Sequence, residues 1–118
     1  MHSEKESGAL RDILRNIKLA EQFARDHTVE TLQADEKTLY AVVRSLEIIS
    51  EASRRLSDEV KSRHPHIEWR EMAAAGNVYR HNYEDVTARR VWKTLHEHLA
   101  ALRIAVEQEL ARNGQQTT

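Results

Sequence analysis

The sequence predicts an all-α protein, an antiparallel bundle of three long helices and one short one. Three observations support this prediction. Only one proline and three glycines occur in 118 residues, so helix breakers are few. Apolar residues recur at intervals of three and four along three long stretches, and no stretch alternates as a half-buried strand would. A hydrophobic fraction of 40% with a charged fraction of 31% is typical of a globular chain, and not of a disordered or membrane-spanning one.

The first long helix is expected over residues 8–26, after a disordered start at residues 1–7. Its apolar positions fall on one stripe of a helix, which predicts that this stripe faces the core. The stripe consists of Leu10, Ile13, Leu14, Ile17, Ala20, Phe23 and Ala24.

A short connection at residues 28–34 leads to Asp35, a good N-cap for a second long helix over residues 36–63. The helix is expected to end at His64-Pro65-His66, because residues before a proline avoid the α region. Val43 and Ile48 widen its apolar stripe, which favours contact with a second copy of the chain. The stripe itself consists of Leu39, Val42, Leu46, Ile49, Leu56 and Val60, with Ser53 filling one turn.

A short third helix is expected over residues 70–79, and the last long helix from about residue 87, capped by Asp85 or Thr87. Asn113-Gly114 is the expected stop, before a polar tail at residues 115–118. These elements predict one domain over residues 1–118, with an ordered core of about residues 8–113. The last apolar stripe consists of Val91, Trp92, Leu95, Leu99, Leu102, Val106 and Leu110.

Composition restricts the compartment and the partners. No cysteine, secretory signal or membrane-spanning run occurs, which favours the cytoplasm and excludes disulfides and thiolate ligands. A net charge of −1 excludes a globally basic nucleic-acid binder, but not a local basic site. His64 and His66 flank a proline at a spacing that is not a preferred chelate, so we expect no metal and no cofactor. Trp69 and Trp92 are expected to anchor the core, with stacking on RNA bases as the alternative.

The residues richest in chemistry are those from Asn77 to Tyr83, which hold an amide, two phenols, a guanidinium and an imidazole. Asn77 and His81 are four residues apart and share a face if the helix continues. An imidazole is a general acid or base near neutral pH, and RNA cleavage needs a proton to leave the 2′-hydroxyl and another to reach the leaving oxygen. The spacing alone also fits a purely structural His81 that caps or packs a helix end.

Four motifs together resemble the HepT-like family, the toxin half of HepT/MntA toxin–antitoxin pairs in the HEPN superfamily. They cover about residues 10–110 in the family's order. The motifs are Tyr40 to Ala52, Pro65 to Met72, Asn77 followed by His81-Asn82-Tyr83, and Val91-Trp92.

The resemblance implies a four-helix HEPN bundle that forms a homodimer, with a metal-independent endoribonuclease cleft at the two-fold interface. His81 then matches the catalytic histidine of the family motif Arg-x-x-x-x-His-x-Tyr, with Asn77 and Tyr83 positioning phosphate or water. The resemblance also implies an MntA-type nucleotidyltransferase antitoxin that transfers AMP to Tyr83. RNA is the implied substrate.

The sequence departs from that motif at Gly76, where the family has arginine. Arg80 is the adjacent cation, and Arg44, Arg70 or an arginine of a second subunit are alternatives. The departure leaves a second hypothesis, an inactive HEPN dimer that serves as binding partner or substrate of a nucleotidyltransferase. A helical dimer with no enzymatic role is the third. Two arginine pairs, Arg54-Arg55 and Arg89-Arg90, fit either solvated faces or contacts to RNA or a partner.

Overall fold

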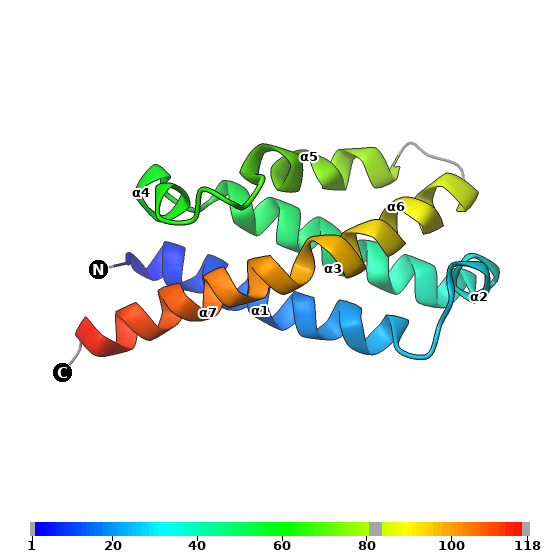
Figure 1. Cartoon of the computed structure of the whole chain (residues 1–118), viewed down its shortest axis with the longest axis horizontal. Coiled ribbons are helices and arrows are strands. Elements are labelled where there is room, and N and C mark those ends of the chain that lie inside the picture. Colours follow the sequence, from blue (N-terminus) through cyan, green and yellow to red (C-terminus); the bar gives the residue numbers. More distant parts are fainter. Residues whose placement is uncertain (1, 81–83, 117–118) are drawn as a thin grey trace.

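The computed structural model describes the backbone of residues 2–80 and 84–116, and the side chains of residues 2–74 and 87–112. Every regular element in these ranges is a helix, which confirms the predicted all-α class. Figure 1 shows four antiparallel rods, formed by α1, α3, α5 and the consecutive pair α6 and α7, with α2 and α4 at opposite ends. The helices are α1 (Glu4–Ala24), α2 (Val29–Ala34), α3 (Glu36–Arg54), α4 (Asp58–Ser62), α5 (Trp69–Arg80), α6 (Glu84–Glu97) and α7 (Leu99–Gln116).

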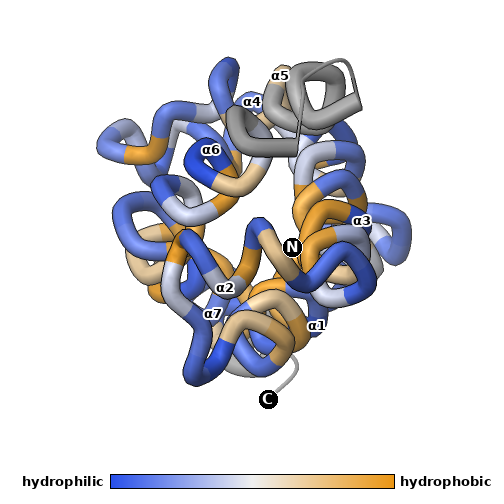
Figure 2. Tube along the Cα trace, turned by 90° about the vertical axis from the view of Figure 1, so that its right-hand side faces the viewer, coloured by the Kyte–Doolittle hydropathy of each residue, from blue (hydrophilic) through white to orange (hydrophobic). Residues whose placement is uncertain are grey.

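The core forms where the predicted apolar stripes meet. α3 packs on α1 and α5, and α1 also packs on α7. Hydrophobic segments of α1 and α3 face the interior in the end-on view of Figure 2. Burying these side chains is the main favourable term in folding. The residues with no exposed surface include Leu10, Ile13, Ile17, Val42, Ile49, Val91, Leu99 and Leu102.

The expected disordered start is wrong, because α1 already begins at Glu4. The Ser3 hydroxyl accepts a hydrogen bond from the Glu6 amide at 3.0 Å, and acidic residues occupy the positive end of the helix. The Glu6 carboxylate in turn accepts from the Ser57 amide at 2.7 Å. The N-terminal turn is therefore fixed both by its own cap and by a contact to a distant segment.

The expected connection at residues 28–34 also contains a helix, α2. Thr28 and Thr31 form a reciprocal cap, in which each hydroxyl accepts from the other residue's amide, at 3.1 and 2.8 Å. Leu32 is fully buried and attaches this short helix to the core. The predicted N-cap at Asp35 is confirmed, since its carboxylate accepts from the Thr38 amide at 3.1 Å and from the Thr38 hydroxyl at 2.7 Å.

The single helix expected over residues 36–63 is wrong, because α3 ends at Arg54 and α4 begins at Asp58. Ser57 starts the second helix by accepting a hydrogen bond from the Val60 amide at 3.2 Å. Leu56 and Val60 remain buried as predicted, at 4% and 2% exposure. The apolar pattern therefore continues across a break that a serine cap produces.

The third helix is confirmed, whereas three details of the last one are corrected. α6 begins at Glu84, so Asp85 and Thr87 lie inside the helix and do not cap it. His98 separates α6 from α7, although hydrogen bonds from His98 N to Thr94 O and from Leu102 N to His98 O continue the ladder at 3.1 and 3.2 Å. α7 extends to Gln116, past the expected stop at Gly114. No helix within the described ranges is long and apolar enough to cross a bilayer.

Candidate functional site

The residues that the sequence predicts to be catalytic fall at the end of α5 and between α5 and α6; this stretch, residues 77–83, is here called the α5–α6 turn. α5 ends at Arg80 and α6 begins at Glu84, so the backbone at positions 77 and 80 belongs to the last turns of α5. His81 and Tyr83 lie outside the described residues, as do the side chains of Asn77 and Arg80. What the structure defines is the framework around this turn.

The Ala73 carbonyl fixes α5 against α3 one turn before Asn77. It accepts hydrogen bonds from Ser50 Oγ at 2.8 Å, Arg54 Nη2 at 2.6 Å and Arg54 Nε at 3.0 Å. Three donors on one oxygen, one of them buried and two charged, set the register of the two helices. Arg54 therefore makes a contact within the chain that neither of the two interpretations of its sequence position predicted.

This register also separates the candidates for the missing motif cation. α3 and α5 run antiparallel in Figure 1, so residues before Ser50 lie level with residues after Ala73. Arg44 is six residues before Ser50, about 9 Å along α3, which places it level with the last turn of α5. Arg70 is three residues before Ala73 and therefore lies toward the start of α5, away from its last turn. Arg44 is 65% exposed and its Nη1 is 4.0 Å from Glu47 Oε1, so its charge is accessible to solvent.

A groove of about 500 Å³ lies between the start of α5 and the helices α6 and α7. Its apolar lining comes from Ile67, Met72, Ala74 and Ala101. Ala74, the last residue of α5 that lines the groove, is three residues before Asn77, about 4.5 Å along the helix. The groove therefore lies on the same side of the bundle as the predicted motif and ends about one helical turn before it.

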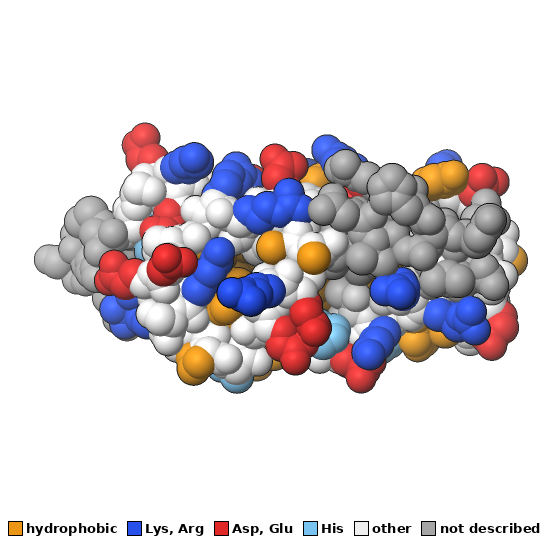
Figure 3. Space-filling model, turned by 90° about the horizontal axis from the view of Figure 1, so that it is seen from above, with side chains coloured by type: hydrophobic (Ala, Val, Ile, Leu, Met, Phe, Trp, Pro, Cys, Tyr) orange, Lys and Arg blue, Asp and Glu red, His pale blue; other side chains and the backbone are white. Residues whose placement is uncertain are grey.

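The polar walls of the groove carry both signs of charge. Glu68 and Glu71 line the α5 side, and Arg90, Lys93 and Glu97 line the α6 side. The pKa of Glu71 is raised, because its protonated carboxyl donates a hydrogen bond to Glu68 and because the negative charge of Glu68 disfavours a second charge beside it. Figure 3 shows acidic, histidine and basic side chains gathered along one edge of this face. The cations are placed where a phosphate could approach, whereas the carboxylates suit groups that donate hydrogen bonds.

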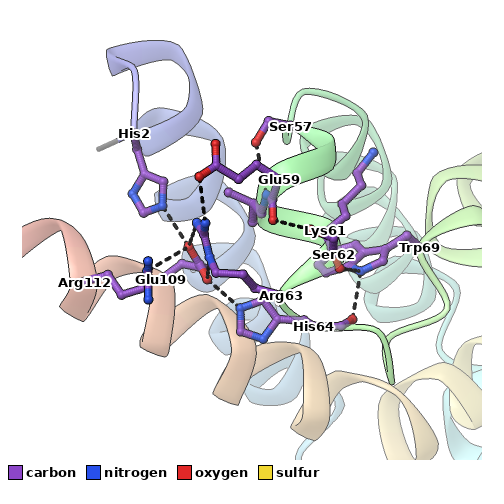
Figure 4. Close-up of polar contacts among 11 residues, drawn as sticks. His2, Ser57, Glu59, Lys61, Ser62, Arg63, His64, Trp69, Glu109 and Arg112 are labelled. Carbon is purple, nitrogen blue, oxygen red and sulfur yellow. Dashed lines mark hydrogen bonds and ion pairs between the residues drawn. The ribbon is translucent and has the colours of Figure 1, made fainter.

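A second polar cluster lies at the other end of the bundle and was not predicted from the sequence. Glu109 on α7 is 1% exposed, and its carboxylate accepts from Arg63 Nη2 at 2.6 Å and Arg63 Nε at 3.0 Å. It also contacts His64 Nε2 at 2.6 Å and His2 Nε2 at 2.8 Å (Figure 4). The cluster connects the N-terminus, the segment after α4 and the last helix.

Burial alone would raise the pKa of Glu109, but the hydrogen bonds from Arg63, His2 and His64 outweigh it and lower that pKa to about 2. Glu109 in turn raises the pKa of Arg63. The carboxylate is therefore ionised and paired. Because the Glu109 cluster lies at the other end of the bundle from the α5–α6 turn, we infer that it stabilises the fold and takes no part in catalysis.

The other residues considered in the sequence make contacts within the fold. His64, considered above as a metal ligand, contacts the Glu109 carboxylate through Nε2. Trp69 and Trp92 are partly buried against the core, as predicted. The Trp69 indole donates to the carbonyls of His64 and Lys61 at 3.1 and 3.2 Å, and the Trp92 ring lies 4.2 Å from that of His96.

Comparison with known proteins identifies the family. The model of the family described as "Ribonuclease HepT-like" matches residues 13–109, which include the whole α5–α6 turn. The chain belongs to this family. The HepT-like resemblance is therefore confirmed.

Curated relatives of this HepT-like chain align over most of both lengths. "Probable ribonuclease HepT" of Thermococcus cleftensis is 43% identical over 94 residues, 80% of this chain and 86% of that protein. A putative RNase of Methanocaldococcus jannaschii is 31% identical over 98 residues, 83% of this chain and 90% of that protein. A putative RNase of Caldanaerobacter subterraneus is 29% identical over 103 residues, 87% of this chain and 92% of that protein. No solved structure matches the chain.

Proposed function

We propose that this protein is a ribonuclease. The observation that carries the proposal is the family match over residues 13–109, together with relatives named as ribonucleases that align over at least four fifths of the chain. The groove between α5 and α6 supports it, because Arg90 and Lys93 place positive charge on α6, the helix that follows the predicted catalytic residues.

The proposed reaction is metal-independent endonucleolytic cleavage by acid–base catalysis. His81 removes the 2′-hydroxyl proton or protonates the leaving oxygen, and Asn77 and Tyr83 position the phosphate or water. Arg80 is the cationic helper from the same turn. This assignment rests on the match of Asn77, His81 and Tyr83 to the family motif.

Arg44 is our candidate for the cation that Gly76 does not supply. The register set by the Ala73 carbonyl brings Arg44 level with the end of α5, whereas Arg70 lies in the other direction. A guanidinium that reaches the phosphate from α3 would stabilise the charge of the transition state in the manner of the motif arginine.

We further propose that the protein acts as a homodimeric toxin, paired with an MntA-type nucleotidyltransferase that silences it by transferring AMP to Tyr83. The outer face of α3 is the candidate dimer surface. Tyr40 on this face is 65% exposed, and Val43 and Ile48 are half-buried. An exposed tyrosine beside partly buried aliphatic residues is typical of an interface. Mass spectrometry after incubation with the partner and ATP tests the modification.

An RNA cleavage assay with EDTA present tests the enzymatic proposal. Wild-type protein should cleave, and His81→Ala should lose at least a hundredfold in rate, since general acid–base catalysis contributes about 10²–10⁴-fold. Arg44→Ala should lower the rate, whereas Arg70→Ala should not. Full activity of the His81→Ala variant would remove the imidazole from the mechanism.

The second candidate is an inactive HEPN dimer that serves as binding partner or substrate of a nucleotidyltransferase, and Gly76 is the observation that favours it. Gly76→Arg separates the two candidates. A large gain of RNA cleavage from an inactive wild type would support the inactive module. Unchanged, substantial cleavage would show that the cation already comes from another residue.

A further inference from the structure

The outward face of α1 carries three cations. Arg11, Arg15 and Lys18 are exposed, and no hydrogen bond or ion pair joins them to another residue in the described part of the chain. At 100° per residue, their spacing of four and three places them within about 60° of one another around the helix. This arc lies roughly opposite the buried stripe of α1, so the three side chains face solvent.

Two carboxylates of α1 near these cations form ion pairs with arginines of other helices or segments. Asp12 pairs with Arg55 at 3.1 Å, and Glu21 pairs with Arg103 at 3.2 Å. Both pairs direct the acidic side chains toward neighbouring elements. The face defined by Arg11, Arg15 and Lys18, here called the α1 stripe, therefore keeps its positive charge on a molecule whose net charge is −1.

The shape of the α1 stripe suits a nucleic-acid strand. The three cations line a shallow hollow of about 370 Å³ together with Leu14, Leu19 and Gln22. Four and three residues of helix correspond to about 6 and 4.5 Å, so the cations span about 10 Å, a length that a few successive phosphates cover. Leu14 and Leu19 flank the cations and offer apolar surface to sugars or bases, and the Gln22 amide offers a donor and an acceptor.

We propose that the α1 stripe is an exosite that binds the phosphate backbone of RNA. This inference rests on the proposed ribonuclease function and adds a second contact to it. α1 and α5 lie on opposite sides of the bundle in Figures 1 and 2, so the stripe is separate from the α5–α6 turn. The exosite therefore contributes to the binding of an RNA large enough to reach both sides, and not to the cleavage of a short oligonucleotide.

The test uses the triple variant Arg11→Gln, Arg15→Gln, Lys18→Gln, because glutamine removes the charge and keeps a good helix propensity. The matched control removes three exposed or half-exposed lysines outside the stripe, Lys5→Gln, Lys37→Gln, Lys61→Gln. Both sets are made in the full chain with His81→Ala, so that RNA is bound without being cut. Thermal melts followed by circular dichroism verify that each variant folds.

Binding of a fluorescently labelled, folded RNA is measured by anisotropy over a series of salt concentrations. Each phosphate contact on a single strand contributes about −0.7 to the slope of log K against log salt. Loss of three contacts should flatten the slope by about 2 and weaken binding about a hundredfold at 0.1 M salt, compared with the control variant. With His81 restored, kcat/KM for a short oligonucleotide should not change.

Equal slopes and affinities for the stripe and control variants would overturn the proposal. It would also be overturned if the triple variant kept RNA binding but lost binding to polyglutamate, since the stripe would then be a docking surface for an acidic protein. If the wild type cleaves no RNA while RNA binding depends on the stripe, the ribonuclease proposal fails and the RNA-binding surface stands. If the wild type cleaves RNA but the stripe and control variants bind RNA equally well, the ribonuclease proposal stands and the exosite proposal fails.

Discussion

Replacing Glu109 by alanine is expected to destabilise the fold severely. The carboxylate is buried and accepts two hydrogen bonds from Arg63, with further contacts to His64 and His2. Glu109→Ala leaves Nε and Nη2 of Arg63 and the buried His64 ring without their acceptor, and only Nη1 of Arg63 keeps one, the exposed Glu59 carboxylate at 3.2 Å. It also detaches His2, next to the N-terminus, from the last helix, and so loosens the N-terminus, the segment after α4 and α7 together.

The expected loss is about 3 kcal/mol, the lower end of the usual cost of removing one partner from a buried ion pair, because Arg63 is itself 26% exposed and keeps its contact to Glu59. The pKa of Glu109 gives a consistent magnitude, since a decrease from 4.5 to about 2 corresponds to roughly 3 kcal/mol of preference for the charged form in the folded state. Such a loss is a large part of the 5–15 kcal/mol that is typical of whole domains.

Urea unfolding measures this loss, followed by circular dichroism and by the fluorescence of Trp69, which hydrogen-bonds to the His64 carbonyl. Glu107→Ala is the matched control, because Glu107 is exposed on the same helix and should change stability by less than about 0.5 kcal/mol. A loss below about 1 kcal/mol for Glu109→Ala, with an unchanged m-value, would refute the reasoning.

Three further predictions concern pH and the helix contacts. The folded pKa of Glu109 is below its ordinary value, so the stability that this carboxylate contributes should be complete above about pH 4.5 and lost as the pH falls through 2. The free energies of unfolding of wild type and Glu109→Gln, measured over pH 2–6, should therefore become equal at the acid end. Asp35→Ala should lower the free energy of unfolding in urea by about 1 kcal/mol, because it removes the N-cap of α3. This loss should be smaller in acid, since hydrogen bonds from Thr38 lower the pKa of Asp35 and are weakened when the carboxylate is protonated. An equal loss at pH 2 and pH 7 would contradict this account. Arg54→Met should cost about 1 kcal/mol and also reduce RNA cleavage, because its hydrogen bonds to the Ala73 carbonyl fix α5; unchanged cleavage would separate that contact from the site.

The sequence predicted much of the helical framework because local chemistry specifies it. Apolar spacing predicted which side chains are buried, and the Asp35 carboxylate marked the start of α3 before any partner was known. The predicted helix boundaries were wrong where a single serine or threonine side chain caps the start of a helix. Ser57 divides the long predicted helix, and Thr28 and Thr31 form α2, although the apolar pattern around them is almost unchanged.

The candidate catalytic residues came from the motif at residues 76–83, whose chemistry and family spacing are local in sequence. Tertiary structure added what surrounds the motif. Ser50 and Arg54 meet the Ala73 carbonyl across 23 and 19 residues, and the groove joins side chains of α5, α6 and α7. These contacts depend on the register of packed helices, which the periodicity of a single helix does not encode.

By itself, the sequence determined the helical class, the core-facing stripes and the family, since each follows from residue types at fixed short spacings. Only the tertiary structure decided that Glu109 is a buried, ionised anchor and that Arg44, not Arg70, lies level with the end of α5. A glutamate on a helix surface and one that binds an arginine 46 residues away have the same local pattern. Packing distinguishes them, because it removes water from one carboxylate and supplies hydrogen-bond donors in its place.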